Sequence, residues 1–223
     1  MRIVIPIFDG FTALDAVGPY EVLRMLPESD VVFAAGAPGP CTDSQGRLGL
    51  LATHSFEDVA EADVLVVPGG PGVDAHTADE RLLDWIRRIH ATTTWTTSVC
   101  TGSLLLGAAG LLDGLEATTH WRAVDALESY GAVYTARRVV EQPGGIVTAA
   151  GVSSGIDMAL RLAELIAGRV AAEAFQLLIE YDPQPPFDSG SYAKASQEAK
   201  DYLAARPRRT AHGAPPASAR SVK

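Results

Sequence analysis

Short apolar segments rich in β-branched residues and bounded by glycine and proline recur along the first hundred residues. They are IVIPIF (3–8), VVFAAG (31–36), VLVVPGG (64–70) and TWTTSVC (94–100). Short segments rich in apolar and β-branched residues are typical of strands buried on both faces. A chain with several such strands must cover both faces of its sheet.

Helical periodicity fills the intervals between these segments. Apolar residues recur at spacings of three and four in PYEVLRML (19–26), DERLLDWIRRIH (79–90) and TGSLLLGAAGLL (101–112). A longer helix is predicted over 153–168, with Ser153 or Ser154 as its N-cap and Gly168 as its stop. Strand and helix therefore alternate, which predicts an α/β sandwich: a mostly parallel sheet with helices on both faces.

Two segments depart from this alternation. Residues 38–56 contain clusters of glycine and proline, and residues 133–151 contain the turn sequence EQPGG, so each is predicted to form a hairpin. Neither an internal repeat nor an interdomain linker interrupts the chain before residue 182. Residues 1–191 are therefore predicted to form a single domain.

Charge is distributed unevenly along the chain. Lysine is absent from residues 1–193, and residues 194–223 carry seven basic and two acidic groups, against 11 basic and 25 acidic groups before them. Without a lysine, the body lacks the phosphate ligand of a P-loop and the amine of pyridoxal phosphate enzymes and Schiff-base aldolases. An acidic body does not suit nucleic acid. Residues 192–223 are predicted to be a basic, flexible tail.

Other composition features narrow the cellular setting. No basic segment followed by an apolar run begins the chain, and no stretch of 18 uncharged apolar residues occurs, so neither a signal peptide nor a membrane span is expected. Two cysteines do not form a disulfide framework, which favours a reducing cytoplasm. The histidines show no ligand spacing, and no metal is predicted.

Cys100 is the strongest candidate for chemistry because it stands where a predicted strand meets a predicted helix. Thr101 and Gly102 allow a tight turn, and the amides and dipole of the helix N-terminus are expected to lower the pKa of the thiol. The cysteine would then be a nucleophile near neutral pH. The alternative is an inert buried cysteine. Cys41, in a loop rich in proline and glycine, is expected to have no catalytic role.

Asp15 is the corresponding carboxylate candidate. It is placed in the turn after the first strand, with Gly18 and Pro19 marking the start of the first helix. A carboxylate there can reach the carboxyl end of the sheet, where ligands bind in open α/β folds. Asp15 could instead be a capping residue, and Glu21 is a second possible acid.

Two further elements complete the predicted site. The glycines of VPGGPG (67–72) let backbone amides approach a ligand, and the amides of Gly70 and Thr101 are a plausible pair for stabilising an anion. His120, in ATTHW, is the histidine expected to lie closest to the site.

In their order and spacing, the segments LDAVGPYEVL, VVPGGPG, SVCTGSLLLGAAGLL, ATTHW and GVSSGID resemble the ThiJ/PfpI superfamily, over residues 1–191. The resemblance implies a flavodoxin-like sandwich, also described as class I glutamine amidotransferase-like, with a cysteine at a strained nucleophile elbow and a homodimeric assembly. Thr101 stands where protease-like members have a histidine, which disfavours peptidase activity.

Within the superfamily the chain is most similar to the isocyanide hydratase branch, through the aspartate of LDAVGP, SVCTGS, GVSSGID and YDPQPPFDSGS. This similarity implies a lyase that converts a small-molecule isonitrile and water to an N-substituted formamide without a metal or organic cofactor. Cys100 would be the nucleophile and Asp15 the general acid and base. The Thr101 and Gly70 amides would orient the site, and Val152 would line an apolar pocket.

Two other activities use the same thiol. A cysteine beside a carboxylate also suits glyoxalase or deglycase chemistry on α-oxoaldehydes. A redox or stress-response protein would instead oxidise Cys100 to a sulfinate.

Overall fold

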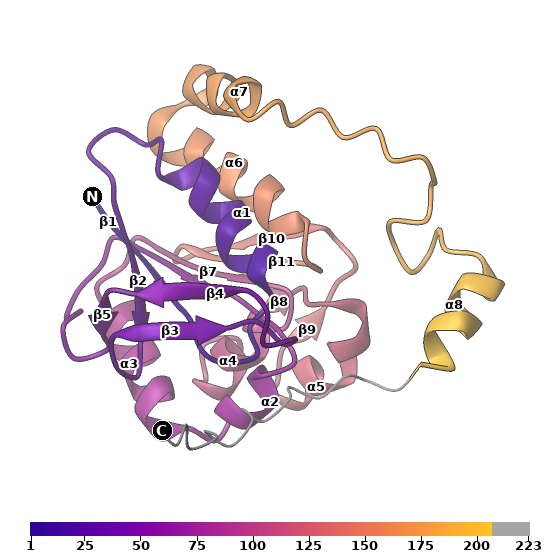
Figure 1. Ribbon diagram of the computed structural model, residues 1–223, viewed down its shortest axis with the longest axis horizontal. Helices are drawn as coiled ribbons and strands as arrows, with labels where there is room; N and C mark the ends of the chain where they lie inside the picture. The colour runs from indigo at the N-terminus through magenta and orange to yellow at the C-terminus, as the bar shows by residue number, and fades with distance from the viewer. Residues whose placement is uncertain (207–223) are drawn as a thin grey trace, which may run out of the picture.

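A seven-stranded sheet forms the centre of the molecule in the computed structural model, which describes residues 1–206 (Figure 1). Its strand order is β10–β11–β7–β6–β1–β2–β5, and all neighbours are parallel except β10 and β11. The strands are β1 (Arg2–Pro6), β2 (Asp30–Ala35), β5 (His54–Ser55), β6 (Val64–Val67), β7 (Trp95–Val99), β10 (Val139–Gln142) and β11 (Ile146–Ala149). The predicted mostly parallel sheet is confirmed.

Helices cover both faces of this sheet. In Figure 1, α1 (Ala13–Leu23), α6 (Ser154–Ala167) and α7 (Arg169–Leu178) lie above the sheet. Below it lie α2 (Val73–His76), α3 (Glu80–His90), α4 (Gly102–Ala108) and α5 (Val124–Ser129). The 3₁₀ turn η1 (Trp121–Ala123) directly precedes α5. Two-sided cover explains why β6 is buried along its whole length and why its sequence is apolar throughout.

Both predicted hairpins are present. β3 (Gly39–Thr42) and β4 (Gly49–Ala52) form a separate antiparallel pair, and β10 and β11 form the antiparallel edge of the main sheet. A further short parallel pair joins β8 (Glu116–Ala117) to β9 (Val133–Tyr134). The flavodoxin-like α/β sandwich expected from the sequence is confirmed.

The first helix begins earlier than predicted. It starts at Ala13, so Asp15 lies in its first turn and Pro19 lies inside it. Proline in a helix interior removes one backbone hydrogen bond, a cost that tertiary packing can offset. Here Pro19 is buried and faces Gly155, where a side-chain carbon would lie 3.2 Å from the Pro19 ring. Close contact between α1 and α6 therefore accommodates the proline.

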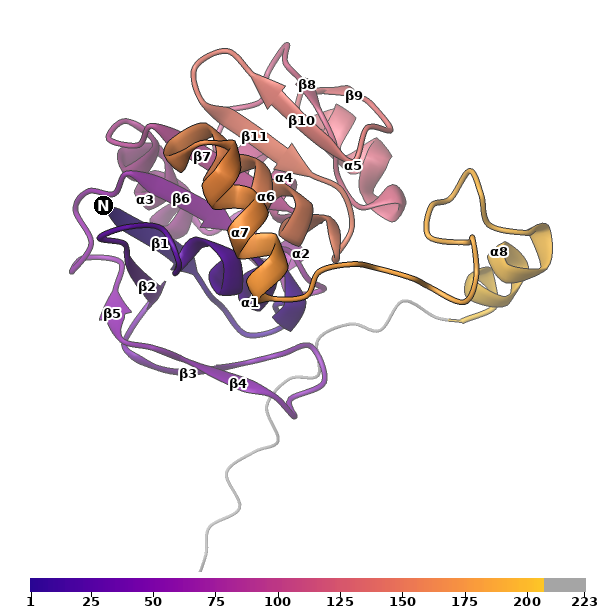
Figure 2. The ribbon, with the colours of Figure 1, turned by 90° about the horizontal axis from the view of Figure 1, so that it is seen from above.

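The chain leaves the sandwich after α7, as Figures 1 and 2 show, and we call residues 181–206 the C-terminal arm. The arm contains α8 (Gln197–Ala204), a helix within the segment expected to be an irregular tail. It contacts the body where the ring of Tyr192 stacks on Trp121, with centroids 4.9 Å apart. The rest of that expected tail, residues 207–223, lies outside the described residues. Within residues 1–206, no helix is long and apolar enough to cross a bilayer.

Candidate active site

Four loops meet at one edge of the sheet. The strands β11, β7, β6 and β1 are consecutive neighbours and run in the same direction, so their carboxyl ends lie side by side. The segments that leave β11, β7 and β6 carry Val152, Cys100, and Gly69 with Gly70, respectively. Asp15 lies in the first turn of α1, which follows β1. Topology thus brings together residues that are up to 137 positions apart in the sequence.

Cys100 occupies a strained turn between β7 and α4. Its φ of 58° lies in the left-handed region, which costs a non-glycine residue on the order of 1–3 kcal/mol. Hydrogen bonds hold this conformation: the Cys100 amide donates to the carbonyl oxygens of Ala149 (3.0 Å) and Ala150 (3.1 Å). The Cys100 carbonyl accepts from the hydroxyls of Ser103 and Thr119, each at 3.1 Å. The neighbouring strand and the helix start together fix the turn.

The loop after β6 packs directly on this turn. A side-chain carbon at Gly102 would lie 2.1 Å from the carbonyl oxygen of Val67, so only glycine fits there. The Gly70 amide donates to Oγ1 of Thr101 at 2.9 Å. This amide is therefore engaged within the protein, which differs from the predicted pair of Gly70 and Thr101 amides available to an anion.

The carboxyl of Asp15 is fully buried beside the Cys100 thiol. Its Oδ2 accepts from the Gly69 amide at 3.0 Å, and the Cys100 side chain also hydrogen-bonds to the carboxyl. Burial raises the pKa of Asp15 to about 7, although the Gly69 amide and the Cys100 side chain act in the opposite direction. Asp15 can therefore gain or lose a proton near neutral pH.

Burial also raises the pKa of the Cys100 thiol, and the charge of Asp15 adds to this effect. Hydrogen bonds from the backbone amides of Thr101 and Val152 to the sulfur oppose it. The net direction is the reverse of the predicted lowering, because a helix terminus acts weakly against desolvation and a neighbouring carboxylate. Cys100 and Asp15 are thus a coupled pair that shares protons.

Val152 and His120 lie on the side of the site formed by β11. Val152 has a φ of 29°, a second strained non-glycine residue, and its amide faces the Cys100 sulfur. The His120 ring lies against Gly151, where a side-chain carbon would be 2.6 Å from Cδ2. Its Nδ1 accepts from the Arg122 amide at 3.2 Å. His120 therefore borders the loop that carries Val152.

The remaining candidates lie elsewhere. Glu21 pairs with Arg24 (2.8 Å) on the exposed side of α1. Cys41 is half-buried in β3, and its thiol donates to the Ile7 carbonyl at 3.7 Å. Both cysteines are free thiols.

Sequence reasoning missed three residues that support the pair. Gly69 binds the Asp15 carboxylate, and Ser103 and Thr119 bind the Cys100 carbonyl. Gly69 stands beside Gly70 in the same glycine pair, and spacing does not reveal which amide is directed at a carboxylate. Thr119 belongs to the segment ATTHW, but its contact with the Cys100 turn arises only from the tertiary fold and has no sequence signal.

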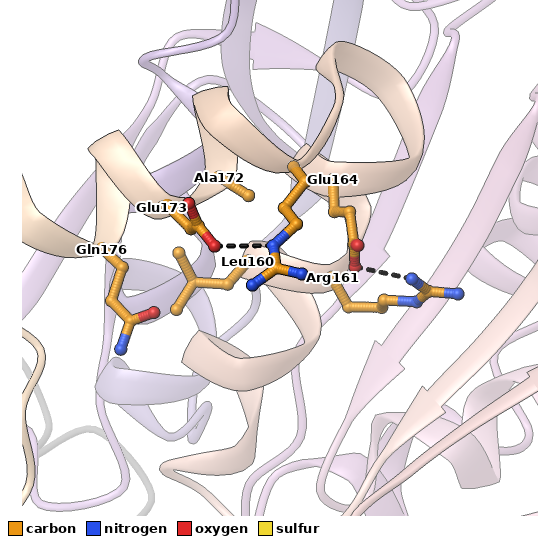
Figure 3. Close-up of a pocket in the computed structure, with 7 residues that line it drawn as sticks. Leu160, Arg161, Glu164, Ala172, Glu173 and Gln176 are labelled. Atoms are coloured by element: carbon orange, nitrogen blue, oxygen red, sulfur yellow. Dashed lines mark hydrogen bonds and ion pairs between the residues drawn. The ribbon is translucent and has the colours of Figure 1, made fainter.

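Two surface clefts lie apart from these residues. One, of about 280 Å³, lies between α6 and α7 (Figure 3). Its charged side chains pair with one another, Arg161 with Glu164 and Arg169 with Glu173. The other, of about 420 Å³, lies between Trp121 and the C-terminal arm. Within residues 1–206, no group of three histidine, cysteine or acidic side chains is placed to hold a metal ion.

Comparison with known proteins places this arrangement in a family. The DJ-1/PfpI family model matches residues 1–165. The isonitrile hydratase of Pseudomonas putida is 48% identical over 185 residues, which cover 83% of this chain and 80% of that enzyme.

Solved structures agree with this assignment. A ThiJ/PfpI family protein from Pseudomonas syringae has a TM-score of 0.87 at 36% identity and covers 91% of this chain and 84% of its own. Drosophila melanogaster DJ-1beta has the same fold, with a TM-score of 0.71 at 21% identity over 80% of this chain and 97% of its own. The alignment with the Pseudomonas syringae protein covers 91% of the chain, whereas the residues before the C-terminal arm make up only about four fifths of it. The alignment therefore includes part of the arm. The chain belongs to the DJ-1/PfpI family.

Proposed function

We propose that this protein is an isonitrile hydratase, which converts an isonitrile and water to an N-substituted formamide. The observation that carries the proposal is the buried pair of Cys100 and Asp15 at the strained turn after β7. The similarity to a curated isonitrile hydratase selects this reaction among those that a thiol and a carboxyl can perform. The same comparison does not favour the α-oxoaldehyde and redox alternatives.

In the first step, the sulfur of Cys100 bonds to the terminal carbon of the isonitrile. Asp15 takes the thiol proton as the sulfur attacks and delivers it to that carbon, which gives a covalent thioimidate, R–N=CH–S–Cys. Oδ1 of Asp15, the oxygen that does not bind the Gly69 amide, is the atom available for this transfer. The amides of Thr101 and Val152 stabilise negative charge on the sulfur as it develops.

In the second step, water attacks the same carbon. Asp15, again ionised, takes a proton from the water and passes it to the nitrogen, which gives the tetrahedral adduct R–NH–CH(OH)–S–Cys. The carbon–sulfur bond then breaks as Asp15 moves the hydroxyl proton to the sulfur. The products are R–NH–CHO and the free thiol, so atoms and charge balance over the cycle. Val152 and neighbouring small residues would line the pocket for the R group.

Turnover of para-nitrophenyl isocyanide to the corresponding formamide tests this proposal directly. We expect steady-state turnover by the wild type, and Cys100→Ala should reduce it by at least about a thousandfold, because the covalent step is lost. Cys41→Ser is the matched control and should retain full activity, since Cys41 lies outside the site. Absence of formamide with the wild type, together with turnover of methylglyoxal, would assign the site to α-oxoaldehydes instead.

A homodimer in a reducing compartment is part of the same proposal. The two free thiols are consistent with reducing conditions. Exposed apolar side chains on α7 provide a surface on which two copies could associate.

A further inference from the structure

The strained conformation of Val152 needs support from outside its own loop. Val152 is a β-branched residue at a φ of 29°, and such a conformation persists only where surrounding contacts fix it. The loop that carries it is tied to the catalytic turn, because the Cys100 amide donates to the Ala150 carbonyl at 3.1 Å. A shift of this loop would therefore move the Val152 amide relative to the Cys100 sulfur.

Arg138 contacts the chain on both sides of Val152. Its carbonyl oxygen accepts from the Ala150 amide at 2.9 Å, and its Nη2 donates to Oγ of Ser153 at 3.1 Å. Ser153 occupies the N-cap position of α6, yet its side chain makes no hydrogen bond to the helix amides. Its hydroxyl is engaged with Arg138 instead, so one arginine fixes the residues that flank the strained position.

Two further side chains hold the guanidinium. Arg138 Nε donates to Oδ2 of Asp157 in the first turn of α6, and the Tyr181 hydroxyl donates to Oδ1 of the same carboxylate at 2.8 Å. Burial and the charge of Asp157 raise the pKa of Tyr181, so its phenol keeps the proton that it donates. Tyr181 in turn accepts from Gln176 Nε2 of α7 at 3.0 Å through its carbonyl oxygen. The network spans the segment before β10, α6 and the end of α7.

Stability does not account for this network. The side chains of Arg138 and Asp157 are 47% and 30% exposed, and ion pairs at such positions contribute little net free energy. Their geometry accounts for it better, since Arg138, which Asp157 holds, contacts Ala150 and Ser153 on the two sides of Val152. We propose that Arg138, held by Asp157 and Tyr181, is a positioning residue that keeps the Val152 amide on the Cys100 sulfur. This inference rests on the proposed role of Cys100.

Arg138→Gln and Asp157→Asn test the proposal, with Arg161→Gln as the matched control. Arg138→Gln keeps the backbone hydrogen bond to Ala150 and loses the side-chain hydrogen bond to Ser153. Arg161 also joins β10 to α6, through Glu141 and Glu164, but its side chain does not contact Ser153 in the described part of the chain. In the two test variants we expect kcat to fall roughly tenfold while KM stays within about twofold, because the loss falls on the developing thiolate and not on substrate binding. Tyr181→Phe should show a smaller loss in the same direction.

Alkylation of Cys100 by iodoacetamide, measured by peptide mass spectrometry between pH 7 and 9.5, is the readout that does not depend on hydratase turnover. The rate reports the thiolate fraction, so it should fall about fivefold to tenfold in Arg138→Gln and Asp157→Asn and stay unchanged in Arg161→Gln. Arg138→Lys should recover part of the rate, because an ammonium still pairs with Asp157 but lacks the second donor for Ser153.

The outcomes separate the two proposals. Equal alkylation rates in Arg138→Gln and Arg161→Gln would overturn the positioning role. Slower alkylation in Arg138→Gln without any isonitrile turnover by the wild type would support the positioning role and reject the substrate. A wild-type Cys100 that does not react at any pH would reject the nucleophile and, with it, the role of Arg138.

Discussion

Asp15 and Cys100 illustrate how burial sets chemistry at the scale of single residues. Removing a carboxyl and a thiol from water disfavours both anions, and their proximity makes the first ionisation oppose the second. The active form of the pair therefore holds one proton. In this form the Asp15 carboxylate can act as a base for the Cys100 thiol. This form is populated between the two macroscopic pKa values of the pair.

The pH dependence of catalysis follows from this pair. We expect kcat/KM to rise with pH through about 7, where Asp15 loses its proton, and to fall at alkaline pH, where the second proton leaves. A steady-state profile from pH 5 to 10 measures the limb near pH 7, whereas the alkaline limb lies at higher pH because burial and Asp15 raise the pKa of the Cys100 thiol. In Asp15→Asn, activity should fall by about a hundredfold or more, and the limb near pH 7 should disappear. Its persistence in that variant would assign the limb to another group.

Ionisation of Asp15, which raises kcat/KM, should lower the free energy of unfolding. Its pKa is about 7 in the folded protein against an ordinary value of 3.8, so between these pH values the folded chain binds the additional proton. The free energy of unfolding then falls as pH rises from about 4 to about 7, and the deficit persists above pH 7. Asp15→Asn removes this penalty and should be more stable than the wild type at pH 8, by on the order of 2–4 kcal/mol. Urea unfolding at pH 4 and pH 8 checks this, because the gain should shrink at the lower pH.

Close packing of elements explains one glycine requirement. Helix α4 begins at Gly102 directly against the end of β6, with the Val67 carbonyl 2.1 Å from where a side-chain carbon would lie. Gly102→Ala should therefore displace the start of α4 and lower the free energy of unfolding by about 3 kcal/mol. Urea titration measures the loss, and turnover should fall as well because Cys100 is two residues away. Gly190→Ala is the control, because a side-chain carbon at Gly190 would have no neighbouring atom within 4 Å, and it should leave the free energy of unfolding unchanged.

Local sequence patterns, such as apolar runs and glycine stops, predicted most strands and the end of α6. They failed where tertiary packing decides the structure. The apolar runs of β1, β2, β6 and β7 were sufficient to predict a buried parallel sheet, and Gly168, with a φ of 86°, ends α6 as expected. The start of α1 was misplaced because Pro19 has the propensity of a first-turn residue, while its packing on Gly155 allows an interior position. Neither α7 nor α8 was predicted, although Ser196 is a capping residue at the start of α8.

The candidate site was predictable to a similar extent. Its positions follow from topology, because ligand sites lie where parallel strands end, and Cys100 and Asp15 both follow strands. The hydrogen-bond directions do not follow from sequence. Gly70 donates to a threonine hydroxyl, Gly69 donates to Asp15, and Val152 faces the sulfur through its backbone. The predicted lowering of the thiol pKa failed because burial, which no local pattern reveals, outweighs the helix terminus.

At the scale of the whole molecule, the most exposed apolar side chains of α7 are not explained by the single chain. Val170, Leu177 and Leu178 are 80%, 77% and 72% exposed, and Val170 and Leu177 lie seven residues apart, on one helix face. Burying each such side chain stabilises an assembly by about 1.5–3 kcal/mol. We therefore predict a homodimer in which α7 of each copy contributes to the interface.

Light scattering after size exclusion tests this assembly. Leu177→Glu places a charge in the predicted interface and should convert the dimer to a monomer, because a buried unpaired carboxylate costs several kcal/mol. Leu51→Glu changes a side chain that is 62% exposed on β4, away from α7, and should leave the dimer intact. Both variants add one negative charge, so a difference in their oligomeric state locates the interface. Such a difference cannot come from the change in net charge. A wild type that elutes as a monomer, or a Leu177→Glu variant that remains dimeric, would show that these leucines serve another purpose.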